Sequence, residues 1–169
     1  LASQYMLGDS LLVAPIFNDQ SMAEYYLPEG TWTSLLTGEV KEGGKWYKEK
    51  QGYLSIPLYV REGSIVARGA HDDDAVYDYA DGVTLNAYAV KPGKSAETAV
   101  YSGDNVKELT AAIRNENGSY KIHVEAKKPC KVVLVNAGTP ASVDGASYTM
   151  EQDNVVISLD GSADVKVVY

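Results

Sequence analysis

The chain has 169 residues, of which 45% are apolar and 22% charged, and its formal net charge is −8. A chain of this length can form one domain or two small ones, and its composition is typical of a soluble globular protein. The negative charge argues against a nucleic-acid partner, because DNA and RNA are bound through Lys and Arg side chains that face phosphates.

The counts of aromatic residues and cysteine give further information on the fold class and the cellular compartment. Thirteen Tyr and two Trp stand against one Phe, and this bias favours half-buried sheets. The single cysteine, Cys130, excludes an intrachain disulfide and favours a reducing compartment, and we expect an inert thiol next to a strand. No apolar run reaches the ~18 residues of a membrane span. The sequence therefore predicts a cytoplasmic protein without a membrane partner.

The first segment, residues 1–16, contains a continuous apolar run at 11–14, bounded by Gly8-Asp9 and Pro15. Such a run is typical of a strand buried on both faces, as in a parallel sheet covered by helices. The chain begins inside apolar sequence and without an initiator Met. We therefore expect it to be a piece of a longer polypeptide, with this strand belonging to a sheet encoded upstream.

The second segment, residues 17–70, has short strand patterns separated by glycine-containing turns. The turns are expected at Thr37-Gly38, Gly43-Gly44 and Glu62-Gly63. The spacing predicts an antiparallel sandwich, with strands at 23–28, 31–36, 45–50, 53–61 and 64–68.

The third segment, residues 71–169, begins with an acidic stretch and continues with alternating apolar and polar residues. Strands are predicted at 109–113, 120–125, 132–135, 155–159 and 165–169. The Asn115–Gly118 sequence is a strong hairpin turn, because Asn-Gly supplies the positive φ angles that such turns need. This segment is predicted to be a second all-β module.

Catalytic chemistry has few candidates. Glycosidic hydrolysis needs two facing carboxylates, and the candidates by type are Asp9, Asp19, Glu24 and Glu29. Asp9 follows Gly8, so a turn role is the preferred interpretation. We therefore predict no catalytic residue in this chain.

Metal and cofactor sites are not indicated either. The run Asp72-Asp73-Asp74 lacks the ligand spacing of a calcium loop, and neither His71 nor His123 has a second ligand at metal-binding spacing. His123 falls on the polar face of its strand and is expected to be exposed. No nucleophile elbow or phosphate-binding loop is present.

Aromatic residues gather in the second segment, and aromatic faces can stack on sugar rings. The candidates for sugar stacking are Trp32, Trp46, Tyr47 and Tyr53. The alternative is that these side chains form the core, because Trp and Tyr bury large areas on folding. We expect Trp32, Leu58 and Val60 to pack there, and Arg61 to be held by a carboxylate.

Three phrases in order, QYMLGDSLLVAPI, YLPEGTW and IPLYVREGSI, closely resemble the C-terminal part of glycoside hydrolase family 31, and most of all its bacterial α-xylosidase branch. The resemblance implies a (β/α)₈ barrel ending near Ile16, followed by a proximal and a distal β-sandwich. The family is a retaining one whose catalytic Asp pair lies on middle barrel strands. No position in this chain matches those motifs, so the resemblance assigns no catalytic residue to it.

The predicted fold is therefore all-β, with two consecutive antiparallel β-sandwich modules preceded by the last strand region of a truncated (β/α)₈ barrel. The predicted function is the non-catalytic C-terminal region of an α-xylosidase or α-glucosidase, inactive alone. Its expected partners are the upstream barrel and, through the parent enzyme, α-linked oligosaccharide, and the parent could be a homo-oligomer. Two alternatives stay open, a free-standing carbohydrate-binding β-sandwich and a purely structural domain.

Overall fold

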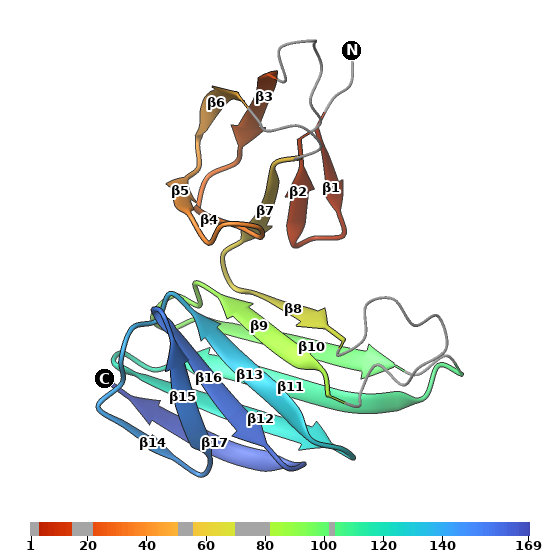
Figure 1. Cartoon of the computed structure of the whole chain (residues 1–169), viewed down its shortest axis with the longest axis vertical. Coiled ribbons are helices and arrows are strands. Elements are labelled where there is room, and N and C mark those ends of the chain that lie inside the picture. Colours follow the sequence, from red (N-terminus) through yellow and green to blue (C-terminus); the bar gives the residue numbers. More distant parts are fainter. Residues whose placement is uncertain (1–3, 15–21, 51–55, 70–81, 102–103) are drawn as a thin grey trace. The chain divides into compact units, whose positions relative to one another are not determined.

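The computed structural model describes residues 4–14, 22–50, 56–69, 82–101 and 104–169. These residues form strands and turns and contain no helix, which confirms the all-β prediction. The chain divides into two compact units, Leu1–Glu62 and Gly63–Tyr169 (Figure 1).

The first unit contains a five-stranded sheet and a two-stranded sheet, and all of its strand pairs are antiparallel. The five-stranded sheet has the order β1-β2-β7-β4-β5, and the two-stranded sheet is β3-β6. The strands are β1 (Tyr5–Leu7), β2 (Leu11–Val13), β3 (Met22–Leu27), β4 (Thr31–Ser34), β5 (Val40–Glu42), β6 (Lys45–Lys50) and β7 (Leu58–Arg61).

Strand β3 shows the alternation of a half-buried strand. Ala23, Tyr25 and Leu27 point into the core, whereas Glu24 is exposed. They pack against buried residues of the five-stranded sheet, among them Leu12 and Trp32. The two sheets therefore share one core, as in a small sandwich.

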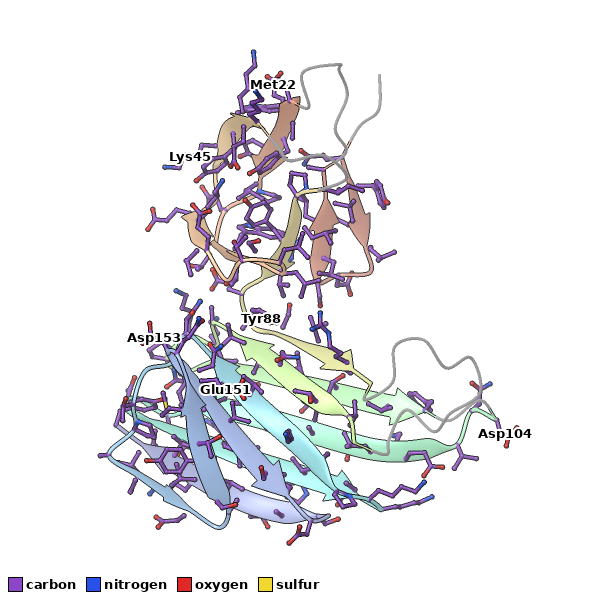
Figure 2. The ribbon with its side chains drawn as sticks, in the orientation of Figure 1. Met22, Lys45, Tyr88, Asp104, Glu151 and Asp153 are labelled. Atoms are coloured by element: carbon purple, nitrogen blue, oxygen red, sulfur yellow. The ribbon has the colours of Figure 1, made fainter. Side chains whose placement is uncertain are left out.

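The connection into β6 depends on a glycine. The amide of Gly44 donates a hydrogen bond of 2.6 Å to the carbonyl of Leu27, which continues the β3–β6 pairing beyond the strands. A Cβ on Gly43 would lie 1.6 Å from the carbonyl oxygen of Pro28, so a side chain cannot be accommodated there without backbone movement. Figure 2 marks the beginnings of the two paired strands at Met22 and Lys45.

The free edge of β3 is occupied by a side chain. The amide group of Gln4 donates from Nε2 to the carbonyl of Tyr26 (2.7 Å) and accepts from the Tyr26 amide at Oε1 (2.5 Å). One side-chain amide thus makes the pair of hydrogen bonds that a neighbouring strand would make.

The expected parallel strand at residues 11–14 is wrong in its pairing. Strand β2 pairs antiparallel with β1 on one side and with β7 on the other. The run is continuous because Leu12, Val13 and Ala14 are all buried, and antiparallel sheets can also bury both faces of a strand. The structure therefore places this segment in the first unit's sheet.

The second unit is a sandwich of two five-stranded sheets, with orders β10-β11-β12-β17-β14 and β15-β16-β13-β9-β8. Its strands are β8 (Ser64–Arg68), β9 (Thr84–Tyr88), β10 (Ser95–Tyr101), β11 (Lys107–Asn115), β12 (Ser119–Ala126), β13 (Cys130–Val135), β14 (Ser142–Asp144), β15 (Ser147–Glu151), β16 (Asn154–Leu159) and β17 (Ala163–Val168). The five strands predicted at 109–169 are confirmed, and the predicted hairpin joins β11 to β12.

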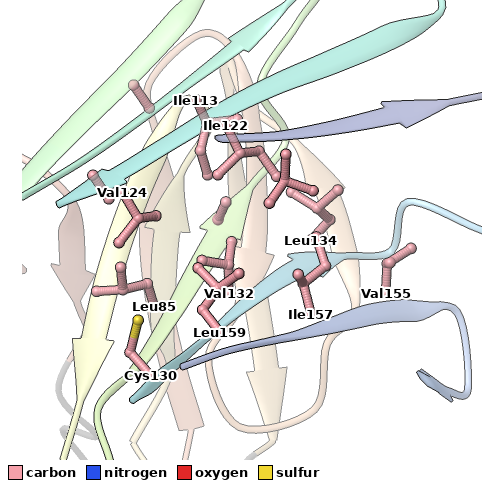
Figure 3. Packing of buried hydrophobic residues seen from close by; sticks show 14 of the residues in the cluster. Leu85, Ile113, Ile122, Val124, Cys130, Val132, Leu134, Val155, Ile157 and Leu159 are labelled. Atoms are coloured by element: carbon pink, nitrogen blue, oxygen red, sulfur yellow. The ribbon is translucent and has the colours of Figure 1, made fainter. Parts of the chain in front are cut away.

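The core of this unit forms where the inner faces of the two sheets meet (Figure 3). Ile113 and Ile122 come from one sheet, and Leu85, Val132 and Ile157 come from the other. Each is 2% exposed or less, so the alternation in the sequence is that of a strand with one buried face.

One feature of the second unit differs from the prediction. Strands β9 and β13 are parallel, so this sandwich is mixed rather than wholly antiparallel. Strand β8 pairs with β9 and falls in the second compact unit, and the predicted domain boundary at residues 70/71 stays a prediction.

Candidate functional site

A group of buried and partly buried polar side chains lies where the two sheets of the first unit meet, and we call it the inner polar cluster: Tyr25, Lys41, Glu49 and Tyr59. The Tyr25 hydroxyl donates to Glu49 Oε1 (2.5 Å) and lies 3.0 Å from the Tyr59 hydroxyl. Lys41 forms an ion pair with Glu49, and its Nζ donates to the Tyr25 hydroxyl (3.1 Å). The four residues come from β3, β5, β6 and β7, so the cluster connects both sheets.

Aromatic rings surround the ammonium of this cluster. Lys41 Nζ lies 4.7 Å from the ring centroid of Tyr47 and 5.4 Å from that of Tyr59. Burial lowers the pKa of Lys41 and raises the pKa of both Tyr25 and Tyr59. Burial disfavours the charged form of each of these groups, so the two tyrosines stay neutral at physiological pH.

The inner polar cluster is a closed structural network rather than a reactive site. Tyr25 is fully buried and Tyr59 is 4% exposed, so a substrate cannot reach their hydroxyls. Each hydroxyl and the ammonium has a partner within hydrogen-bonding distance. A fully satisfied buried network fixes the geometry of a core, and here it links the two-stranded sheet to the five-stranded one.

The four residues predicted for sugar stacking lie in different environments. Trp32 is fully buried, its Nε1 donates to the Pro28 carbonyl (2.7 Å), and its ring has no exposed face. Tyr47 points toward the inner polar cluster, stacks on Tyr25 with centroids 5.8 Å apart, and donates its hydroxyl to the Glu42 carbonyl (2.6 Å). Tyr53 lies outside the described residues.

Trp46 differs from the other three because its side chain is 66% exposed. It stands directly opposite Tyr26 across β3 and β6, and the two ring centroids are 5.6 Å apart with an interplanar angle of 58°. We call Tyr26 and Trp46 the outer aromatic pair. Of the predicted stacking residues that the structure describes, Trp46 has the ring most open to a ligand.

The carboxylate candidates that the structure describes are surface residues. Asp9 lies in the turn between β1 and β2, as its preferred interpretation predicted. Glu24 is on β3, Glu29 is in the turn before β4, and all three are exposed. Asp19 lies outside the described residues.

The remaining polar candidates of the sequence are surface or core residues. His123 is exposed on β12, and its Nδ1 lies 2.6 Å from Asp164 Oδ1, which raises the pKa of the imidazole. Cys130 is buried in the second unit's core, and burial raises the pKa of its thiol. Within the described ranges, no group of three or more His, Cys, Asp or Glu side chains could hold a metal ion. His71 and Asp72–Asp74 lie outside those ranges.

The outer face of the β10-β11-β12-β17 sheet carries a shallow trough of about 670 Å³. Its lining has charges of both signs, contributed by Glu97, Arg114, Lys121, His123, Asp144, Asp164 and Lys166. Neighbouring charges pair with each other: Arg114 and Lys121 both contact Glu116, and His123 contacts Asp164. The trough is therefore a hydrated sheet face whose charges are largely balanced.

Sequence reasoning missed the inner polar cluster. A lysine at the centre of the pattern Val40–Glu42 reads as a surface residue, because nothing local shows that β5 turns Lys41 toward three tyrosines. A strand at residues 23–28 was predicted, and in the structure Tyr25 shares its buried face with Ala23 and Leu27. The partner of its hydroxyl could not be predicted from that pattern.

Comparison with known families identifies the two units. Residues 1–66 match the Glycosyl hydrolase family 31 C-terminal domain, and residues 78–169 match the family described as Alpha-xylosidase YicI, C-terminal domain. The chain belongs to glycoside hydrolase family 31, of which it is a C-terminal portion.

Curated relatives refine this assignment. The chain is 37% identical to Alpha-xylosidase XylQ of Lactiplantibacillus pentosus over 97% of its own length, but it covers 20% of that protein. It is 31% identical to an Alpha-xylosidase of Saccharolobus solfataricus over 70% of its length, covering 16% of that protein. The chain thus spans about a fifth or less of the length of these relatives.

Solved structures share the fold. The GH31 dextranase FjDex31A of Flavobacterium johnsoniae aligns over 99% of this chain and 27% of its own, with a TM-score of 0.84 and 16% identity. The cycloalternan-forming enzyme of Listeria monocytogenes aligns over 99% and 19%, with a TM-score of 0.81 and 21% identity. Among the described residues, no helix is long and apolar enough to cross a membrane.

Proposed function

We propose that this chain is the non-catalytic C-terminal region of a retaining α-glycosidase that hydrolyses terminal α-xylosidic or α-glucosidic bonds. The observation that carries the proposal is the similarity to an α-xylosidase along nearly the whole chain. The family resemblance adds support, because it implies that the catalytic Asp pair lies upstream of this chain. Alone, the chain is therefore expected to be inactive.

The proposed partner is the upstream catalytic barrel of the same polypeptide. Strand β1 lies at the edge of its sheet, and Tyr5, Met6 and Leu7 are 55%, 37% and 59% exposed. Three consecutive exposed apolar residues on a sheet edge are a liability that proteins usually cover. Contact between this edge and the rest of the enzyme would bury that surface and hold the first unit in place.

The test is to capture the native protein from a soluble lysate with an antibody raised against this chain, and to assay α-xyloside and α-glucoside hydrolysis on the captured material. We expect a polypeptide several times longer than this chain that hydrolyses at least one of the two substrates. The ratio of the two rates assigns the sugar. A captured protein no longer than this chain and without activity would contradict the proposal and favour a free-standing carbohydrate-binding module.

The finer predictions of the sequence remain proposals. A cytoplasmic location follows from the single cysteine, and homo-oligomerisation of the parent follows from the family resemblance. Fractionation of the cells followed by size-exclusion chromatography of the captured enzyme tests both. The assignment of residues 1–16 to the end of the barrel is also a prediction, which a structure of the whole enzyme tests.

A further inference from the structure

The outer face of the β3–β6 sheet presents the outer aromatic pair to solvent. Side chains alternate across a strand, so Tyr26 and Trp46 lie on the face opposite to Tyr25 and Tyr47, which point into the unit. The Trp46 side chain is 66% exposed, whereas the other tryptophan, Trp32, is fully buried. An exposed indole beside a phenol ring is an amphipathic surface with an open aromatic face.

The backbone under this pair is fixed on both strands. On β3, the Gln4 side chain bonds both the amide and the carbonyl of Tyr26. On β6, the neighbouring Tyr47 is held by stacking on Tyr25 and by its hydrogen bond to Glu42. The two rings therefore sit on a backbone that is ordered before any ligand arrives, which lowers the entropic cost of binding.

Hydrogen-bonding groups border the pair on the same face. Glu24 and Lys48 form the next cross-strand pair on this face, two residues along their strands from Tyr26 and Trp46. Both side chains are exposed. A carboxylate accepts hydrogen bonds and an ammonium donates them. Together they can bond adjacent hydroxyl groups of a ligand whose apolar face rests on the rings.

We propose that the outer aromatic pair, with Glu24 and Lys48, binds one pyranose ring of a neutral oligosaccharide. A pyranose has the required chemistry, because its C–H face is apolar and its rim carries hydroxyl donors and acceptors. No catalytic residue is assigned to this chain, so the site would hold a glycan chain without cleaving it. It goes beyond the proposed function, since it needs no activity of the parent enzyme. With one ring contact, we expect a dissociation constant of roughly a millimolar.

The two tryptophans allow a direct first experiment on the 169-residue chain. Acrylamide quenches exposed indoles, so it reports Trp46, while Trp32 remains as an internal unquenched reference. We expect maltoheptaose, isomaltoheptaose or a xyloglucan heptasaccharide to reduce the quenching constant at least twofold at tens of millimolar. Sorbitol at equal mass, which has no ring, should leave the quenching constant unchanged. A quenching constant that none of the three oligosaccharides changes would overturn the proposal.

Variants with a ligand-observed readout complete the test. In saturation-transfer NMR, Trp46→Ala should remove the oligosaccharide signal, and Trp46→Tyr should restore most of it because a ring remains. Glu24→Ala should weaken binding about three- to tenfold, as expected for the loss of one solvent-exposed hydrogen bond. Tyr101→Ala is the matched control, since Tyr101 is an aromatic residue of the second unit that is 51% exposed, and it should change nothing.

Two results of these measurements refute the site. One is an unchanged saturation-transfer signal in Trp46→Ala, with Trp32 emission confirming that the variant is folded. The other is a Trp46 that is already protected from acrylamide in the full-length enzyme without sugar, because another part of the polypeptide would then cover the rings. Loss of the signal in Trp46→Ala with retention in Trp46→Tyr supports it.

Discussion

Replacing Trp32 with Ala should destabilise the first unit severely. Trp32 is fully buried between the two sheets, and the guanidinium carbon of Arg61 lies 5.1 Å from the centroid of its ring. Trp→Ala substitutions in cores cost about 3–5 kcal/mol. The lost hydrogen bond from Nε1 leaves the Pro28 carbonyl without that donor, which places the cost at the upper end of this range.

The effect should be large relative to the stability of the unit. At about 0.05–0.15 kcal/mol per residue, a unit spanning Leu1–Glu62 has roughly 3–9 kcal/mol of stability, so the substitution removes about a third or more of it. For a domain of this size, the melting temperature falls by roughly 4–8 °C per kcal/mol. Differential scanning calorimetry should show the transition of the first unit shifted down by roughly 15–30 °C, or absent at room temperature.

Trp46→Ala is the matched control, because it removes the same side chain from an exposed position. It should change the free energy of unfolding by about 1 kcal/mol or less, the value of its cross-strand pair with Tyr26. A Trp32→Ala melting curve that matches that of the unsubstituted chain would refute the packing argument. Equal losses in the two variants would refute it as well, since burial would then not explain the cost.

Three further predictions test other contacts. Gly43→Ala places a Cβ 1.6 Å from a backbone carbonyl oxygen, so urea titration should show that the free energy of unfolding falls by about 1–3 kcal/mol or more. Gly161→Ala is the control, because its Cβ would lie 3.6 Å from the nearest atom, and it should lower the free energy of unfolding by less than about 1 kcal/mol. Glu49→Gln deprives the ammonium of Lys41, whose side chain is 10% exposed, of its anionic partner, so we expect a loss of about 1–3 kcal/mol, and an unchanged urea midpoint would argue against the network. The two carboxylates beside His123 raise its pKa above 6.5, so its contribution to stability is complete below that pH and disappears as the pH rises through the folded-state pKa. The stability difference between the unsubstituted chain and His123→Ala should therefore shrink as the pH rises above 6.5, and a difference independent of pH would contradict the contact.

Much of the second unit could be predicted because its strands alternate cleanly. Ile113 and Ile122 fall on the buried face and Lys121 and His123 on the exposed one, as the period of two requires. The Asn-Gly turn then set the β11–β12 register. These features are local, so a single sequence contains them.

The errors concern non-local pairing. Leu11–Val13 reads as a parallel strand because both of its faces are buried, but burial on two faces does not specify the direction of its neighbours. The parallel contact between β9 and β13 joins segments far apart in the chain, and no turn signal marks it. Arg61 was expected to meet a carboxylate, but its guanidinium lies over the Trp32 ring, and no ion pair of Arg61 is observed among the described residues.

The candidate surface was predictable in part. The clustering of Trp and Tyr indicated a core or a sugar-binding surface, and the structure places Trp32 in the core and Trp46 on the surface. Trp32 and Tyr47 point inward, whereas Trp46 points outward, because adjacent residues of β6 face opposite sides. Which face becomes the interior depends on the rest of the unit, so the sequence alone left both interpretations open.

The Gln4 side chain also bears on how this protein behaves at high concentration. An open strand edge is a template on which a second molecule can add a strand, and repeated addition leads to aggregation. At β3, the two groups of Tyr26 that would recruit such a strand are already bonded to the Gln4 amide. The Gln4 side chain therefore blocks the addition of a second molecule's strand at Tyr26, a role that would otherwise need an additional strand of this chain.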